Sequence, residues 1–224
     1  MADGAAPQLR VLLRAAAVSY IIGAMIVPVV LAAGESRRMG RPKPLLPIYE
    51  TTFLSHILGV LKGVGFPTMT VVLGHEAEYI RPQAEGPGVD VVINPRYHEG
   101  QLTSLHAAIR HLAEVSPAAD GLLVCLVDHP LLIPVVIRRM VAAFAREDKP
   151  IIIPTCKGRR GHPVIFGRSV FGELLDAPAD QGARAVVRRL PERVLELEVG
   201  DEAILTDVDT PEHYEALRHR LMGS

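Results

Sequence analysis

Short apolar runs alternate along the chain with segments whose apolar residues recur at helical spacing. The runs 26–32, 121–127 and 151–154 are rich in Val, Ile and Leu, which is typical of strands buried on both faces of a sheet. The segments 52–63 and 134–146 place their apolar residues on one helical face. This alternation predicts a three-layer α/β/α fold with a mostly parallel sheet. Further strands are expected at 68–73, 89–93, 163–166, 194–199 and 203–205, and further helices at 76–83, 103–114, 168–175, 183–190 and 211–221.

The segment 151–205 breaks the rhythm, because its expected strands follow one another closely. We therefore expect an antiparallel addition to the sheet in this region. The run 121–127 is fully apolar, which predicts a central strand. The sequence has no internal repeat and no Pro- or Ser-rich linker, so residues 25–224 are expected to form a single domain.

The segment 15–33 carries no charge and is long enough to be a candidate membrane span. Arg10 and Arg14 precede it in the manner of a signal peptide. However, its second half is needed as the first strand of the sheet, and Pro28 with several small residues weakens a membrane helix. We expect residues 1–24 to be an N-terminal extension, disordered or loosely packed, with no membrane anchor. A chain starting at Met25 is expected to be soluble and active.

Composition excludes several classes of protein. Lys and Arg total 24 against 25 for Asp and Glu, and this balance argues against a nucleic-acid binder, which would show a strong basic excess. The chain has 2 cysteines, Cys125 and Cys156, too few for a disulfide framework or a four-cysteine zinc site. The chain therefore reads as a cytoplasmic, reduced protein.

The loop after the first expected strand has the composition of a phosphate site. Ligands of open α/β sheets bind at the carboxyl ends of the strands. Gly34 and Gly40 allow backbone N–H groups to turn inward around an anion. A solvated basic loop is the simpler alternative, but the position after a buried strand favours a triphosphate site that lacks the Walker and GxGxxG patterns. Its basic residues are Arg37, Arg38, Arg41 and Lys43.

Residues 31–43 read LAAGESRRMGRPK and resemble the LAAGxSxRMGxxK signature of nucleotidyltransferases related to the molybdenum cofactor guanylyl- and cytidylyltransferases. The resemblance extends from Met25 to about Leu221. It implies a Rossmann-like nucleotidyltransferase fold and transfer of a nucleotidyl group to a phosphate-bearing acceptor, molybdopterin, with release of pyrophosphate. The cytidylyltransferases of this group usually read LAAG and the guanylyltransferases LAGG, so the sequence favours CTP.

The same resemblance implies roles for individual residues. Arg38 and Lys43 would hold the triphosphate, and Lys43 would also stabilise charge as the α-phosphate is attacked. Asn94 and the run from Gly100 to Leu105 resemble the N-P…G-x-x-x-S-L element, where Gly100 would let the base or ribose approach. Ser104 is either a helix cap or a nucleotide contact. The predicted nucleotide-binding residues are Leu31, Ala32, Ala33, Gly34, Ser36, Arg37, Asn94, Gly100 and Ser104.

Asp128 is predicted to bind Mg²⁺ and to act in catalysis with Lys43 and Arg38. It follows a fully apolar strand, where a carboxylate is poorly solvated unless it is paired or binds a metal. Mg²⁺ prefers one or two carboxylates together with substrate phosphates. The segment resembles the D-x-P motif of the family, whose Asp carries magnesium. His129 stands where that motif usually has Met or Gln, and we expect it to be a packed or surface histidine.

A second carboxylate for the metal is expected in residues 206–212. Asp207 and Asp209 alternate with Val208 and would point to one face of an extended segment. The segment resembles the closing D-[IV]-D-T-P-E element of the family. Asp209 could instead cap the helix near Pro211. We predict that Asp207 completes the Mg²⁺ site and that Asp209 is structural.

The acceptor is expected to bind in the irregular part of the chain. Arg160 and His162 belong to a stretch that resembles the R-G-H-P motif of the cytidylyltransferase branch, and Arg184 to one that resembles its D-x-G-A-R motif. A phosphate-bearing acceptor would use such donors. A surface cation is the alternative for Arg184.

Two other functions are compatible with these motifs. The same fold could act on GTP or on a sugar phosphate. The chain could also be a binding module that hands a modified cofactor to a molybdenum hydroxylase without turnover. The sequence has no nucleophile elbow and no HExxH motif, so hydrolase chemistry of those types is not expected.

Overall fold

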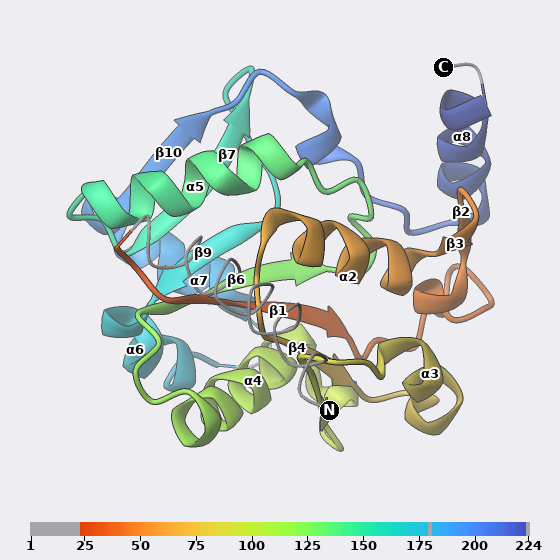
Figure 1. The fold of residues 1–224 in the computed structure, drawn as a ribbon, viewed down its shortest axis with the longest axis horizontal. Coiled ribbons are helices and arrows are strands. Elements are labelled where there is room, and N and C mark those ends of the chain that lie inside the picture. The colour runs from red at the N-terminus through yellow and green to blue at the C-terminus, as the bar shows by residue number, and fades with distance from the viewer. Residues whose placement is uncertain (1–22, 179–180, 223–224) are drawn as a thin grey trace, which may run out of the picture.

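The computed structural model describes residues 23–178 and 181–222, in which one large sheet lies between two layers of helices (Figure 1). In this part of the chain the sheet has eight strands, in the order β10-β7-β9-β6-β1-β4-β5, with β8 paired to β7. β6 therefore lies in the middle of the seven-strand path, as its apolar sequence predicts. The strands are β1 (Ile26–Ala32), β4 (Met69–Leu73), β5 (Val89–Ile93), β6 (Gly121–Leu126), β7 (Ile151–Cys156), β8 (Arg159–Arg160), β9 (Val164–Gly167) and β10 (Val194–Glu198).

The sheet is parallel apart from β8 and β9. β1 pairs in parallel with β4 and β6, and β10 pairs in parallel with β7. β9 is antiparallel to both of its neighbours, β6 and β7. The expected antiparallel addition is thus confirmed for β8 and β9, whereas β7 and β10 continue the parallel direction.

Helices cover both faces because the side chains of each strand alternate between them. In β1, Val30 contributes to the core beneath α2, α3, α5 and α8, whereas Val29 contributes to the core beneath α4, α6 and α7. Figure 1 shows α2 and α5 on one side of the sheet and α4 and α6 on the other. The helices are α2 (Phe53–Val64), α3 (Ala77–Ala84), α4 (Gln101–Val115), α5 (Pro134–Arg146), α6 (Phe171–Leu175), α7 (Gly182–Arg189) and α8 (Pro211–Met222).

The expected strand at 203–205 is wrong, because this segment is the 3₁₀ helix η5 (Glu202–Leu205). The side chain of Asp201 accepts a hydrogen bond from the Ala203 N–H and so caps this turn. The long first loop also contains regular structure that the pattern missed. It holds the 3₁₀ helix η1 (Lys43–Leu45) and leads into a hairpin of β2 (Pro47–Ile48) and β3 (Thr51–Thr52).

Residues 26–32 of the long apolar run form β1, as expected. The backbone N–H of Met25 donates to the Asp120 carboxylate over 2.7 Å, and the Asp120 N–H donates to the Met25 carbonyl over 2.8 Å, so Met25 pairs with the residue that precedes β6. Among the described residues, no helix is long and apolar enough to cross a membrane. Residues 1–22, most of the expected N-terminal extension, lie outside the described part of the chain, as does Asp180 of the D-x-G-A-R stretch.

Candidate active site

The loop after β1 folds back on itself and brings Lys43 to the carboxyl edge of the sheet. Ser36 adopts a left-handed conformation, with φ of 53°, and its carbonyl accepts hydrogen bonds from the N–H groups of Met39 and Gly40. The Ser36 hydroxyl accepts a further bond from the Lys43 N–H over 3.1 Å. Met39 is buried and anchors the loop in the core. The backbone therefore fixes where the Lys43 side chain starts.

The Lys43 ammonium group lies between two carboxylates from distant parts of the chain. Its Nζ atom is 3.3 Å from Oδ2 of Asp128 and forms a shorter ion pair with Oδ1 of Asp209. The other oxygen of Asp209 accepts a hydrogen bond from Arg38 over 2.7 Å. Only 11% of the Lys43 side chain is exposed, so solvent screens these contacts weakly. Lys43, Arg38 and Asp128, the predicted catalytic residues, thus gather in one cluster with Asp209.

Asp209 has a low pKa in this cluster. Burial raises the pKa of its carboxyl, but the hydrogen bond from Lys43 and the positive charges of Lys43 and Arg38 outweigh that effect and leave the pKa below its ordinary value. Asp209 is therefore a carboxylate at neutral pH.

The expected role of Asp209 as the cap of α8 is wrong. The Thr210 hydroxyl accepts the hydrogen bond from the His213 N–H over 3.3 Å, so Thr210 is the capping residue. Asp209 precedes the cap and turns its carboxylate toward Lys43. Asp207 is exposed and lines the larger of the two cavities described below.

The other two cations of the loop, Arg37 and Arg41, contact residues outside the cluster of Lys43, Asp128 and Asp209. The guanidinium of Arg37 pairs with Glu35 and its side chain is 82% exposed. The guanidinium of Arg41 stacks 5.1 Å from the centre of the Tyr214 ring. Of the four basic residues expected at the phosphate site, Arg38 and Lys43 lie in the cluster, whereas Arg41 lies over Tyr214. A role of Arg37 in nucleotide binding stays a prediction.

A small cavity of about 150 Å³ opens beside this loop. Five predicted nucleotide-binding residues line it, namely Leu31, Ala33, Gly34, Ser36 and Ser104, together with Lys43, Tyr97, Gln101, Val127 and Asp128.

Two predicted nucleotide residues have side chains that serve the fold. Ala32 is 1% exposed and packs on the opposite face of the sheet, in the core beneath α2. The Asn94 side chain is buried and donates hydrogen bonds to the hydroxyls of Thr103 and Ser104, over 2.9 and 3.0 Å. Asn94 therefore fixes the first turn of α4, on which Ser104 faces the small cavity.

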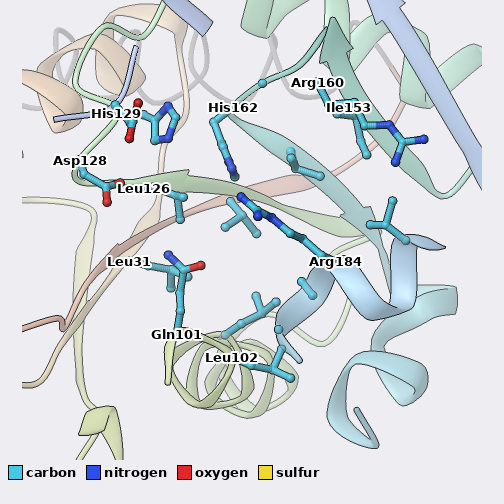
Figure 2. Close-up of a pocket in the computed structure, with 18 of the residues that line it drawn as sticks. Leu31, Gln101, Leu102, Leu126, Asp128, His129, Ile153, Arg160, His162 and Arg184 are labelled. Atoms are coloured by element: carbon cyan, nitrogen blue, oxygen red, sulfur yellow. The ribbon is translucent and has the colours of Figure 1, made fainter. Parts of the chain in front are cut away.

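A larger cavity of about 830 Å³ lies next to the small one, over the sheet face between α4 and α7 (Figure 2). Its floor is apolar and includes Leu31, Leu126 and Ile153. The two cavities share Leu31, Gln101 and Asp128, so Asp128 stands where they meet. Gly100, predicted for the nucleotide, lines this larger cavity, where its φ of 119° requires glycine.

The three predicted acceptor residues all line the larger cavity, but they differ in what they contact. Arg160 donates two hydrogen bonds to Oε1 of Glu196, over 2.8 and 2.6 Å. Figure 2 shows Arg184 reaching from α7 toward His162. Within residues 23–178 and 181–222, no hydrogen bond or ion pair engages the Arg184 guanidinium. Arg184 is thus the better placed of the two arginines to meet a ligand.

His162 and His129 lie together at the side of this cavity, with ring centres 4.7 Å apart. Burial, the neighbouring His129 and the charge of Arg184 together lower the pKa of His162 to about 3. Burial also lowers the pKa of His129, against the opposing effect of nearby carboxylates. Both imidazoles are therefore neutral at physiological pH. His129 is half-buried and borders the larger cavity.

The donor set fits a magnesium ion. Within the described part of the chain, Oδ1 of Asp128 is buried without a hydrogen-bond partner, while Oδ2 faces Lys43. No cluster of three or more His, Cys, Asp or Glu side chains suited to a metal occurs among these residues. Two carboxylates suffice for Mg²⁺, because water and substrate phosphates supply its remaining ligands.

Sequence reasoning missed Gln101 and misread Asp209. Gln101 is exposed at the start of α4, and Figure 2 shows its amide directed into the larger cavity. Its position directly after Gly100 could have indicated it, since a residue beside a close-approach glycine also lies near the ligand. The position of Asp209, two residues after Asp207, indicated that both carboxylates lie on one face of the segment. The contact of Asp209 with Lys43 could not be predicted, because it joins residues that are far apart in the sequence.

Known proteins resemble this chain along most of its length. Nicotine blue oxidoreductase of Paenarthrobacter nicotinovorans is 28% identical, over 84% of this chain and 93% of that protein. The molybdenum cofactor cytidylyltransferase of Escherichia coli K12 is 24% identical, over 86% of this chain and 95% of that protein. The crystal structure of Rv0371c from Mycobacterium tuberculosis H37Rv has a TM-score of 0.75 and 36% identity, and covers 88% of this chain and 99% of that one. Rv0371c has also been solved with manganese.

The family described as the MobA-like NTP transferase domain matches residues 28–194, from the first strand of the sheet to the first residue of β10. This range contains the LAAGESRRMGRPK loop, Asp128, Arg160 and Arg184. The chain belongs to the family of MobA-like NTP transferase domains.

Proposed function

We propose that this protein transfers CMP from CTP to a phosphate-bearing acceptor and releases pyrophosphate. The observation that carries the proposal is the position of Lys43, Asp128 and Asp209 at the junction of two cavities. The nucleotide occupies the small cavity and the loop after β1. The acceptor occupies the larger cavity. The two substrates then meet beside Asp128.

The reaction at this junction is an in-line displacement. An oxygen of the acceptor phosphate forms a bond to the α-phosphorus of CTP, the bond from that phosphorus to the bridging oxygen of the β-phosphate breaks, and pyrophosphate leaves. Such a reaction needs little covalent chemistry from the protein. Positioning of the two substrates and stabilisation of the developing charge supply most of the rate.

Lys43 and Arg38 carry the electrostatic part of this role. Both bind Asp209 through charged hydrogen bonds, and both would exchange these contacts for triphosphate oxygens. Because Lys43 is nearly buried, its charge acts in a region of low dielectric, where it stabilises a phosphate more strongly than in water. The backbone bond from Lys43 to Ser36 fixes the position from which this side chain starts.

Asp128 and one further carboxylate, Asp207 or Asp209, would hold Mg²⁺. The ion would neutralise phosphate charge and orient the triphosphate. The free Oδ1 of Asp128 supports this assignment, and so does the manganese complex of the relative from Mycobacterium tuberculosis.

The choice of CTP and of molybdopterin rests on the LAAG sequence and on the acceptor cavity. Ala33 places its side chain in the small cavity, where the guanylyltransferase pattern has glycine. A cavity of about 830 Å³ with an apolar floor suits a large ring system better than a small sugar phosphate. Arg184 and His162 would bind polar groups of this acceptor. These features favour molybdopterin over a sugar phosphate, and CTP over GTP.

The test is a comparison of CTP, GTP and UTP, each with molybdopterin and Mg²⁺, in an assay of pyrophosphate release. We expect turnover with CTP, and a value of kcat/KM at least about tenfold lower with the other two nucleotides. The D128N variant is the control for background hydrolysis. A preference for GTP would establish the alternative specificity. Binding of the nucleotide without pyrophosphate release from any of the three would favour the non-catalytic module.

A further inference from the structure

Tyr214 lies outside both cavities but contacts the loop that carries Lys43. Its side chain is 4% exposed, and its hydroxyl donates a hydrogen bond to the Pro47 carbonyl over 2.8 Å. Phe53 meets its ring edge-on with centres 5.9 Å apart. The guanidinium groups of Arg41 and Arg218 lie 5.1 and 5.9 Å from the ring centre. Tyr214 thus connects α8 with the first loop.

The other end of this connection is Asp209. Tyr214 belongs to the first turn of α8, and its N–H donates to the Thr210 carbonyl over 3.0 Å. Thr210 directly follows Asp209 in the chain. On the other side of Asp209, the N–H of the fully buried Val208 donates to the Asp128 carbonyl over 2.8 Å. The backbone of Asp209 is therefore held on one side by the Asp128 carbonyl, through Val208, and on the other side by the first turn of α8.

The connection to Lys43 is equally short. Lys43 begins η1, and the Leu46 N–H that closes this turn donates to the Lys43 carbonyl over 3.1 Å. Pro47, whose carbonyl accepts the Tyr214 hydroxyl, follows directly. Figure 1 shows α8 beside β2 and β3, at the edge of the molecule. Tyr214 thus connects the segment that carries Lys43 to the segment that carries Asp209. The ion pair between Lys43 and Asp209 is a second contact between the same two segments.

We infer that Tyr214 is a positioning residue, which sets the place of the Asp209 carboxylate relative to the Lys43 ammonium group. This inference rests on the proposed function for its effect on turnover. Without the bond to Pro47, α8 can shift on the loop, and Asp209 shifts with it because a single residue, Thr210, separates it from the helix. A shift of this kind reduces the rate of the chemical step more than it weakens binding of the acceptor. Asp209 borders the acceptor cavity, but the predicted acceptor residues Arg160, His162 and Arg184 belong to other segments of its lining.

A purely structural role is the alternative, because a buried tyrosine with a bonded hydroxyl is common in protein cores. The Y214F variant separates the two roles, since it keeps the ring and removes the hydroxyl. The control is Y79F, which alters a tyrosine that is 68% exposed on α3.

The first measurement is amide hydrogen exchange of the full chain without nucleotide. In Y214F we expect faster exchange in residues 36–47 and 205–213, with the strands β1 and β6 unchanged, and no change in Y79F. Unchanged exchange in both segments, or a uniform increase along the whole chain, would overturn the inference. This readout does not require turnover, so a protein that releases no pyrophosphate would refute the proposed function without deciding the role of Tyr214.

The second measurement is steady-state turnover. We expect kcat of Y214F to fall about three- to tenfold, with KM for the acceptor unchanged. If Tyr214 acts through Asp209, the Y214F/D209N double variant has the same kcat as D209N. Additive losses in the double variant, or a fall in activity that merely follows the folded fraction of Y214F, would overturn the inference.

Discussion

Lys43 and Asp209 form an ion pair although 166 residues separate them along the chain. Lys43 comes from the loop after β1, and Asp209 comes from the segment before α8. The pair lies at the carboxyl edge of the sheet, where ligands of parallel α/β folds bind. Because the Lys43 side chain is nearly buried, removal of one partner leaves the other charge poorly solvated. The contact therefore joins a segment near the start of the sequence to one near its end, at the point where the reaction is proposed.

Lys43 and Asp128 are expected to be indispensable for turnover. We predict that K43A and D128A each reduce pyrophosphate release by a factor of at least about 100, because each removes a charged group from the site of nucleotidyl transfer. Circular dichroism and thermal unfolding would show that the fold is retained. K62A changes an exposed lysine on α2 and should have normal activity. Turnover near the wild-type rate in K43A or D128A would refute the mechanism.

The roles of Asp209 and Asp207 can be distinguished with the isosteric variants D209N and D207N. Asp209 contacts Lys43 and Arg38, whereas Asp207 is exposed on the larger cavity. We therefore expect D209N to reduce kcat by about tenfold or more and to raise the Mg²⁺ concentration needed for half-maximal rate. D207N should have the smaller effect on both quantities. If D207N raises the Mg²⁺ requirement and D209N does not, Asp207 is the metal ligand and Asp209 acts through the cations.

Arg184 is predicted to bind the acceptor more strongly than Arg160 does. The Arg184 guanidinium reaches into the larger cavity, while Arg160 is held by Glu196. Loss of one charge-assisted hydrogen bond to a ligand costs about 1.5–3 kcal/mol, so R184A should raise KM for the acceptor by about tenfold or more. KM for CTP should stay the same. An equal or larger increase in R160A would assign the acceptor contact to that residue instead.

Much of the fold follows from local pattern. β1 was predictable because every residue of Ile26–Ala32 is buried and apolar, and α5 because Pro134 opens a segment with one apolar face. The strand predicted at 203–205 was wrong because three apolar residues fit a strand or a helical turn equally well. The hydrogen bond from the Ala203 N–H to the Asp201 side chain favours the helical turn. The close succession of strands in 151–205 predicted an antiparallel addition, but the place of β9 between β6 and β7 depends on long-range pairing, which local periodicity does not encode.

The site was predictable where a motif is contiguous. The loop of residues 31–43 carries its own spacing, so Lys43 and Arg38 could be identified from it. The engagement of Arg41 by Tyr214 and the contact of Asp209 with Lys43 join segments far apart in sequence, and they required the folded chain. Gln101 was missed because an exposed glutamine at the start of a helix has an ordinary explanation until both cavities are seen.

Ala33 is expected to influence the choice of nucleotide. Its side chain lines the small cavity, and it stands where the guanylyltransferase pattern has glycine. We predict that A33G lowers the preference for CTP over GTP by about tenfold, because one methyl group contributes roughly 1–3 kcal/mol of discrimination in a close-fitting site. The ratio of kcat/KM values for the two nucleotides measures this preference. A32G is the control, since Ala32 faces the opposite core, and it should retain the selectivity.

His162 is expected to make the protein less stable at mildly acidic pH. The pKa of His162 is about 3 in the folded protein and near 6.5 in the unfolded chain, so between these values the unfolded state binds the additional proton. The free energy of unfolding therefore decreases as the pH falls from 6.5 toward 3. At pH 7.5 the residue is neutral in both states and contributes nothing to the pH dependence.

Urea unfolding at pH 7.5 and pH 5.0 would measure this contribution. A single such group can account for at most about 1.4 kcal/mol per pH unit, which amounts to about 2 kcal/mol between pH 6.5 and 5.0. We expect H162Q to lose less stability than the wild type over this interval, because a neutral amide cannot take up the proton. H219Q alters an exposed histidine on α8 and should behave as the wild type. An identical loss in H162Q and wild type would mean that burial, together with His129 and Arg184, does not hold His162 in its neutral form.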